Sequence, residues 1–179
     1  MAEQSGRSLE SERGALLTSL LSGGVEFVII GGAAVQSHGV DYRTEDIDAT
    51  PRRSRENLER LASVLNDLEC VLVVDAADPT TDVPLPPDYF TSDNLAQTDL
   101  WNLRTRHGKL DIAFAPAGFA KGYEDLIGGA TEITVAFTDT TASVAALVDV
   151  EHSKREAGRA KDIAYLESVG RLRTSKTQT

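Results

Sequence analysis

The chain has 179 residues, of which 41% are hydrophobic, so it is long enough for one domain with a substantial core. Its net charge of −10 excludes a generic basic nucleic-acid coat protein, because neutralising phosphates supplies most of such a protein's affinity. No apolar run approaches the ~20 residues of a membrane span. The polar N-terminus is unlike a secretory signal, and a single cysteine, Cys70, excludes an internal disulfide. We therefore expect a cytoplasmic protein without a membrane partner.

The hydrophobic pattern of the first half predicts helices and strands in alternation. Leucines at helical spacing indicate a first helix, which Gly23 and Gly24 end. The run VEFVII is typical of a buried strand, and Ser54 is a favourable N-cap. In chain order we expect a helix over 8–22, a strand over 25–30, a short helix between Gly31-Gly32 and Gly39, a strand over 46–50, a helix over 55–68 and a strand over 71–74.

The second half begins with a proline-rich stretch, residues 75–93, which we expect to be a surface loop with a binding or lid role, or without fixed structure. The segments LWNLRT and LDIAFAP, separated by HGK, predict a β-hairpin. We then expect a helix over 119–127, a strand at EITVAF, a helix that Ser143 caps and Gly158 interrupts near residue 157, and a last helical segment to Val169.

This mixed order predicts an α+β fold, with a small mixed β-sheet flanked by helices and short C-terminal helices. We divide the chain into an N-terminal helix (1–24), a core (25–142), C-terminal helices packing on the core (143–170) and a flexible tail (171–179).

Two carboxylates in the stretch GVDYRTEDIDATP are the first candidate for chemistry. Side chains at i and i+2 of a strand point the same way, so Asp46 and Asp48 converge if residues 46–50 are extended. Convergent carboxylates are a natural seat for Mg²⁺, a hard ion that takes oxygen ligands. Alone, such a pair is more often an accidental surface feature.

Two other features strengthen this candidate. Gly31 and Gly32 lie between a buried strand and a helix, where bare backbone lets a phosphate approach; a tight turn that needs a positive φ explains them equally well. Asp111 lies in an otherwise apolar strand, where a carboxylate is costly unless it is paired or binds a metal, although it is equally compatible with a solvent-facing position.

Together these elements resemble the DNA polymerase β-like nucleotidyltransferase superfamily. Its signature is a strand, a Gly-Gly or Gly-Ser pair that opens a helix, an Asp-hydrophobic-Asp on the next strand and a third Asp on a later strand. The segments IIGGAAVQSHG, RTEDIDAT and GKLDIAF match this order over residues 25–115.

The C-terminal stretch LVDVEHSKREAGRAKDIAYLESV resembles the AbiEii/MenT-type branch of that superfamily, whose final helices carry a Lys, then Arg, then Lys-Asp. The matching positions are Lys154, Arg159, Lys161 and Asp162, which extends the resemblance to residues 25–169. The best-known members of this branch are toxins of toxin–antitoxin systems that transfer nucleotides to RNA, including tRNA 3′ ends. This chain is short for the branch, lacks a large C-terminal helical domain and is acidic.

The resemblance implies a role for each candidate residue. Asp46 and Asp48 would hold Mg²⁺ and the NTP phosphates, and Asp111 would bind a second metal and help activate the attacking hydroxyl. Gly31 and Gly32 would make room for phosphates. The cations Lys154, Arg159 and Lys161 would neutralise the triphosphate. Arg43 would either support the triphosphate or pair with Glu45, and Asp162 would cap the helix or pair with Arg159.

Three functions remain open from the sequence. The first is a Mg²⁺-dependent nucleotidyltransferase with an RNA acceptor and a cognate antitoxin. The second is the same enzyme acting on a small molecule such as an antibiotic, or on a protein side chain; the acidic composition suits a cationic drug. The third is a non-catalytic binding module, which has no use for three aspartates.

Overall fold

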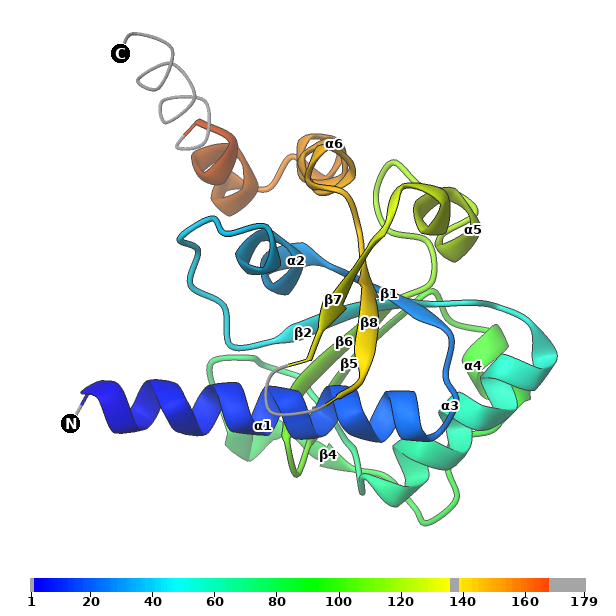
Figure 1. Cartoon of the computed structure of the whole chain (residues 1–179). Coiled ribbons are helices and arrows are strands. Elements are labelled where there is room, and N and C mark those ends of the chain that lie inside the picture. The colour runs from blue at the N-terminus through cyan, green and yellow to red at the C-terminus, as the bar shows by residue number, and fades with distance from the viewer. Residues whose placement is uncertain (1, 136–138, 168–179) are drawn as a thin grey trace, which may run out of the picture.

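The computed structural model describes residues 2–135 and 139–167 (Figure 1). Its helices are α1 (Ala2–Ser22), α2 (Gly31–Ser37), α3 (Arg55–Asp67), α4 (Ser92–Ala96), α5 (Tyr123–Leu126), α6 (Leu147–Ala157) and a last helix that begins at Ala160 and is described through Glu167. The strands are β1 (Phe27–Ile30), β2 (Ile47–Pro51), β3 (Val71–Leu72), β4 (Val83–Pro84), β5 (Leu100–Thr105), β6 (Gly108–Ala113), β7 (Thr131–Thr134) and β8 (Thr141–Val144). The expected tail and residues 168–170 lie outside the described residues.

One mixed sheet of eight strands, in the order β4-β3-β5-β6-β2-β1-β8-β7, organises the molecule. β2 lies at its centre, antiparallel to β1 and parallel to β6. β5 and β6 form the expected hairpin, with Thr105 opposite Gly108. β8 joins β1 in parallel from the far end of the chain. The predicted α+β class with a mixed sheet flanked by helices is therefore confirmed.

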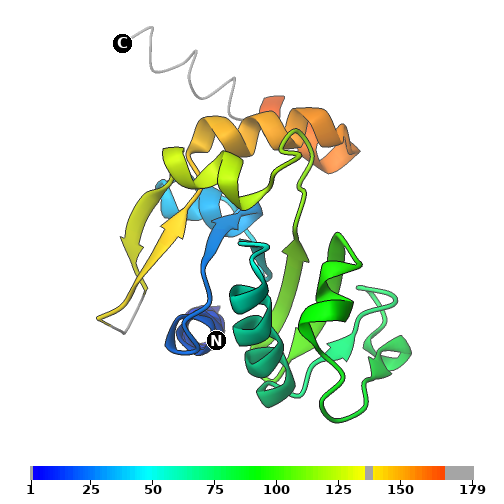
Figure 2. The ribbon, with the colours of Figure 1, turned by 90° about the vertical axis from the view of Figure 1, so that its right-hand side faces the viewer.

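The central strands have one buried face and one open face. Their buried positions alternate along each strand: Ile47 and Ala49 on β2, Trp101 and Leu103 on β5, and Leu110 and Ile112 on β6. α1 contacts both α3 and β6, and Figure 1 shows α1 and α3 on one side of the sheet. α2 contacts α6, and Figure 2 shows α2, α5 and α6 gathered at the other end of the molecule from α1. Asp48 on β2, Asn102 on β5 and Asp111 on β6 lie on the open face.

Local signals in the sequence account for several element ends. The Ser54 hydroxyl accepts a hydrogen bond from the Asn57 backbone N–H and caps α3, as predicted. Gly158 takes a left-handed conformation with φ 60° and ends α6 where the sequence indicated an interruption. Both helix ends are set by residues adjacent to them in the sequence, so they could be predicted without knowing the tertiary contacts.

The prediction that Ser143 caps the C-terminal helix is wrong. Ser143 lies in β8, where it is in register with Val28 of β1, and its hydroxyl donates to Glu132 of β7. α6 begins only at Leu147, after Ala146. The boundary that we placed between residues 142 and 143 therefore falls inside a strand. A pairing with β1, more than a hundred residues earlier, overrides the local capping signal.

Residues 75–93 are mostly exposed, as expected for a surface loop, but they also contain ordered elements. A 3₁₀ turn spans Pro79–Thr81, and β4 pairs with β3 at the sheet edge. Two predicted elements are shorter than expected: β3 covers Val71–Leu72, and α5 covers Tyr123–Leu126 before a further 3₁₀ turn at Ile127–Gly129.

Candidate active site

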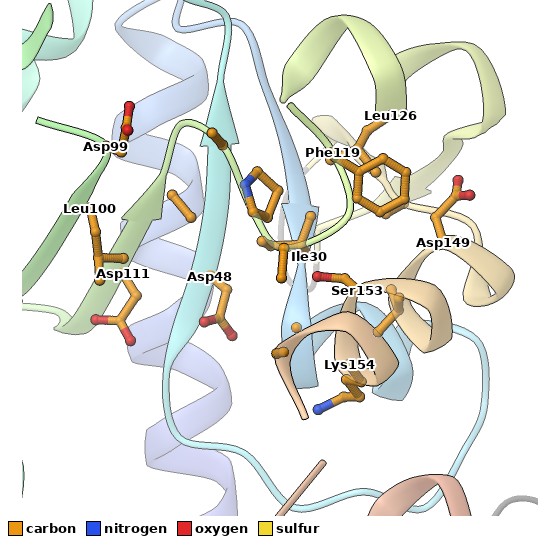
Figure 3. A pocket seen from close by; sticks show the side chains of 18 of the residues that line it. Ile30, Asp48, Asp99, Leu100, Asp111, Phe119, Leu126, Asp149, Ser153 and Lys154 are labelled. Carbon is orange, nitrogen blue, oxygen red and sulfur yellow. The ribbon is translucent and has the colours of Figure 1, made fainter. Parts of the chain in front are cut away.

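A row of side chains crosses the open face of the sheet at the level of Asp48. In this row Asp48 is in register with Asp111 on β6 and with Ile30 on β1, and Asp111 is in register with Asn102 on β5. Residues that are partners across adjacent strands point to the same face, so the two carboxylates lie side by side. Figure 3 shows Asp48 and Asp111 turned to the same side. Asp46 precedes β2 by one residue and is also partly buried.

The Asp48 side chain contacts the pair of glycines that follows β1. Gly31 has φ 62°, and a Cβ on it would lie 2.0 Å from the Asp48 Oδ2 atom. A Cβ on Gly32 would lie 2.7 Å from the Cβ of Thr44, and the Gly32 N–H donates a hydrogen bond to the Asp48 carboxylate. We expected a phosphate to approach the bare backbone at Gly31, but the Asp48 carboxylate occupies that space. Both the positive φ and the close approach require glycine.

The electrostatics of this row favour a bound cation. Burial and then the charge of Asp46 raise the pKa of Asp48, against a hydrogen bond from Gly32 and the charges of Lys154 and Lys161, which lower it. Burial raises the pKa of Asp111 to about 7, with Asp48 and Asp46 adding to the rise. These carboxylates repel one another in a partly desolvated place, and a cation between them would relieve that repulsion.

A cavity of about 360 Å³ opens beside this row (Figure 3). Asp48 and Asp111 line one end of it, and Phe119, Leu126 and Asp149 line the other (Figure 3). Gly31 also lines the cavity. The volume lies within the ~300–1,000 Å³ range of small-molecule sites. The cavity thus places an apolar compartment next to a pair of carboxylates.

Lys154 enters the cavity wall from α6 and is held by its surroundings. The residue is 8% exposed, and its Nζ atom donates to Asp162 Oδ1 at 2.9 Å. The ammonium also lies 5.4 Å from the ring centre of Tyr42 and 4.9 Å from that of Tyr165. Its neighbour Arg155, about 100° further around the helix, is exposed. Lys154 is therefore a preorganised cation at the cavity rather than a solvated surface lysine.

Asp162 joins the two cations of the cavity wall. It is fully buried and accepts a second hydrogen bond from Arg159 Nε at 2.5 Å. Burial alone would raise the pKa of Asp162, but the hydrogen bonds from Arg159 and Lys154 hold it below its usual range. The expected pairing with Arg159 is present, and the bond to Lys154 is an addition that the sequence did not reveal.

The remaining predicted cations differ in their positions. Lys161 is exposed on the last helix, and its charge lowers the pKa of both Asp48 and Asp111. Arg43 is exposed, and within the described part of the chain it forms no ion pair, so the expected pair with Glu45 is not made. Neither residue lines the cavity.

The three aspartates do not form a ready-made metal site. Among residues 2–135 and 139–167, no three His, Cys, Asp or Glu side chains are grouped so that they could hold a metal ion. The donor set nevertheless fits a hard divalent ion, because Asp48 and Asp111 are adjacent and Asp46 Oδ1 is buried without a hydrogen-bond partner in this part of the chain. The carboxylates would have to close around the ion.

Two residues beside the site escaped the sequence analysis. Lys109 Nζ lies 3.9 Å from Asp46 Oδ1, and Asp149 lies at the apolar end of the cavity. The alternation along β6 was a usable signal for Lys109, because it places residues 109 and 111 on one face. No local pattern marks Asp149, which reaches the cavity only through the packing of α6.

The other candidates have structural roles. Tyr89, Phe90 and Trp101 pack edge to face, with ring centres 5.4 to 6.4 Å apart, as expected for loop packing. His38 Nε2 lies 2.8 Å from the Ala145 carbonyl oxygen. Burial raises the pKa of the Cys70 thiol to about 12, so this cysteine is unreactive at neutral pH.

The chain is similar in structure to a known protein but matches no known family by sequence. No protein-family model and no curated protein matches the chain. Among solved structures, the solution structure of the antibiotic-resistance factor ANT(2″)-Ia is similar, with 15% sequence identity and a TM-score of 0.47. The match covers 94% of this chain and 96% of that one. The case for a function therefore depends on the side chains of this chain itself.

Proposed function

We propose that the protein is a Mg²⁺-dependent nucleotidyltransferase that moves a nucleoside monophosphate from an NTP to an acceptor hydroxyl. The observation that carries this proposal is the direct pairing of Asp48 with Asp111, beside a cavity whose wall also contains Lys154 and Arg159. Adjacent carboxylates and preorganised cations around one cavity are what charge neutralisation at a triphosphate requires. A plain binding module has no need for the carboxylates.

Asp48 and Asp111, together with Asp46, are the residues that would hold Mg²⁺, one ion or two. When bound, the metal supplies positive charge to the phosphate oxygens and lowers the cost of placing a triphosphate beside three carboxylates. For Gly31 and Gly32 we propose a role in addition to making room for phosphates. They position the Asp48 carboxylate, one by leaving room for it and the other through its N–H.

The transfer itself makes a bond between the acceptor oxygen and the α-phosphorus and breaks the bond from that phosphorus to the leaving pyrophosphate. Asp111, which lines the cavity, accepts the proton of the attacking hydroxyl. Lys154, fixed by Asp162, stabilises the charge that moves onto the pyrophosphate. Arg159, Lys161 and Arg43 are the further cations for the triphosphate.

For the acceptor, the sequence resemblance favours RNA, such as a tRNA 3′ end, with the protein acting as the toxin of a toxin–antitoxin pair. A specific observation favours a second acceptor, a small hydroxylated molecule that carries amines. Asp149 lies at the apolar end of the cavity, and in the described residues it forms no ion pair. A carboxylate in that place suits an ammonium group of an antibiotic better than a nucleic-acid phosphate.

Radiolabelled transfer separates these alternatives. Each NTP, labelled at the α-phosphate, is incubated with Mg²⁺, the protein and either total RNA or a panel of aminoglycosides. We expect label on one acceptor class with the wild-type protein and none with Asp48→Asn or Asp111→Asn. NTP binding without transfer to any acceptor would identify a binding module, and no NTP binding at millimolar concentration would overturn the proposal.

A further inference from the structure

Two cations lie opposite each other on the open face of the sheet, one level away from the paired aspartates. Arg104 on β5 is in register with Lys109 on β6, and Lys109 precedes Asp111 by two residues. The burial pattern of β6 hides Leu110 and Ile112, so Lys109 and Asp111 share the open face. This pair of cations therefore borders the carboxylates directly.

Like charges directly opposite each other in an antiparallel pair destabilise it unless an anion offsets them. Each cation has one carboxylate on its outer side. Arg104 Nε donates to Asp82 Oδ2 at 2.5 Å, and this ion pair is largely buried. Lys109 has only a looser contact, with its Nζ atom 3.9 Å from Asp46 Oδ1. Across the sheet the two cations thus lie between two carboxylates. Of the two cations, Lys109 has the weaker contact with its carboxylate.

The Asp46–Lys109 contact is electrostatic rather than a formed hydrogen bond. At 3.9 Å the atoms are beyond hydrogen-bond distance, and Asp46 Oδ1 is buried without a hydrogen-bond partner among the described residues. The charge of Lys109 also lowers the pKa of Asp111, so it acts on two of the three carboxylates. Among the described residues, Lys109 is the only cation in ion-pair contact with Asp46.

Building on the proposed function, we propose that Lys109 takes the place of the divalent ion at Asp46 in the free protein and contacts a phosphate of the nucleotide once that ion is bound. A divalent ion on Asp46 takes away the carboxylate that is in ion-pair contact with Lys109, and leaves the ammonium facing Arg104. An incoming phosphate oxygen restores the balance for both cations. Metal and nucleotide would then bind cooperatively. The metal releases Lys109 from Asp46, and the phosphate of the nucleotide offsets the repulsion between Lys109 and Arg104 that this release leaves.

Metal binding without nucleotide tests the first half of this proposal. Mn²⁺ affinity is measured by electron paramagnetic resonance on the wild-type protein, Lys109→Met, Lys109→Arg and Lys121→Met. Lys121 is exposed, does not line the cavity and is not among the charges that shift the pKa of Asp48 or Asp111, so its variant is the matched control for losing one lysine. We expect Lys109→Met to bind Mn²⁺ about threefold to fivefold more tightly, the range of a partly exposed ion pair. Lys109→Arg and Lys121→Met should resemble the wild type.

Nucleotide binding at saturating Mg²⁺ tests the second half. Calorimetry with the NTP that the wild type binds should show about tenfold weaker binding by Lys109→Met, the size of one lost charge-assisted hydrogen bond. Lys121→Met should not change it. Melting temperatures confirm that each variant is folded, and Met keeps the aliphatic stem of the lysine in place.

The possible results separate this inference from the proposed function. Wild-type protein that binds nucleotide and Mn²⁺, with Lys109→Met equal to it in either measurement, overturns the role of Lys109 and leaves the enzyme proposal standing. Weaker Mn²⁺ binding by Lys109→Met also overturns the inference, because it means that Lys109 merely orders Asp46. Wild-type protein that binds neither Mn²⁺ nor any NTP overturns both proposals.

Discussion

The Asp48 carboxylate occupies the place where a side chain on Gly31 would begin. A Cβ on Gly31 would lie 2.0 Å from Asp48 Oδ2 and 2.5 Å from its Cγ, which no real contact tolerates. The glycine is at the end of β1, and the aspartate is on the antiparallel neighbour β2. Any side chain at position 31 would therefore displace the Asp48 carboxylate as well as strain the backbone turn.

Gly31→Ala should therefore damage both stability and activity. The left-handed backbone alone costs about 1–2 kcal/mol with a Cβ, and the clash must also push Asp48 away from Asp111. Gly39→Ala is the matched control, because Gly39 has φ 76° and a Cβ there meets nothing within 4 Å. Thermal unfolding should show a drop of about 3–5 °C for Gly39→Ala and a larger one for Gly31→Ala. Equal drops with normal transfer activity in both variants would contradict the steric argument.

Asp48→Asn should abolish the thermal stabilisation by nucleotide and Mg²⁺. A ligand that binds only the folded protein raises the melting temperature by mass action. The amide keeps the shape of the side chain in the space above Gly31 but removes the charge that would hold the metal. Differential scanning fluorimetry with each NTP and Mg²⁺ should show a shift for the wild type and little or none for the variant. An undiminished shift in Asp48→Asn would exclude this carboxylate from the nucleotide site.

Asp111 should make stability fall as the pH rises in metal-free buffer. Burial raises its pKa in the folded protein from 3.8 to about 7. Between these values the folded state binds more protons than the unfolded chain, so the free energy of unfolding decreases with increasing pH. Asp111→Asn removes this loss and should be more stable than the wild type at pH 8, on the order of 1 kcal/mol, because partial exposure reduces the effect. Denaturant titrations at pH 5 and pH 8 measure the free energy of unfolding of both proteins. A stability difference between Asp111→Asn and the wild type that does not grow with pH would contradict the raised pKa.

Much of the site was predictable because its signals are local. The alternation in DIDAT fixed which residues of β2 face the core, and Ile47 and Ala49 are indeed buried while Asp46 and Asp48 are not fully covered. Parallel pairing of β2 with β6 then aligns Asp48 with Asp111. The sequence could place both residues on strands, but only the sheet order shows that these strands are neighbours.

The features that the sequence missed depend on distant contacts. Ser143 has a side chain suited to a helix cap, yet β8 forms because a free edge of β1 is available to it. Asp162 directly follows Lys161 in the sequence and is nonetheless fully buried, because Lys154 on the preceding helix and Arg159 neutralise it. No local pattern reports such a partner, since helix packing alone brings it within reach.

The ion pair between Lys154 and Asp162 changes how the role of Lys154 has to be tested. Lys154→Ala should lower turnover by about 100-fold, comparable to the loss of one preorganised electrostatic contact, but it also deprives a buried carboxylate of one of its two partners. Lys154→Met loses the same hydrogen bond to Asp162, but it fills the space between Tyr42 and Tyr165 and so leaves no cavity. Lys154→Arg should recover little, since the planar guanidinium cannot occupy the same point.

Arg155→Ala and Asp162→Asn complete the series for Lys154. Arg155 is exposed on the same helix, so its loss should leave turnover unchanged. Asp162→Asn keeps the shape of the side chain but weakens its hydrogen bond with the Lys154 ammonium. Turnover should fall by about tenfold, which is less than for Lys154→Met. In Lys154→Met the Asp162→Asn change should then lower turnover less than it does in the wild type, because only the hydrogen bond to Arg159 remains to be weakened. Single-turnover rates at saturating NTP measure all four variants. Additive losses in the double variant would show that Asp162 acts by a separate route, and a wild-type rate for Lys154→Met would leave the aspartates as the supported part of the site.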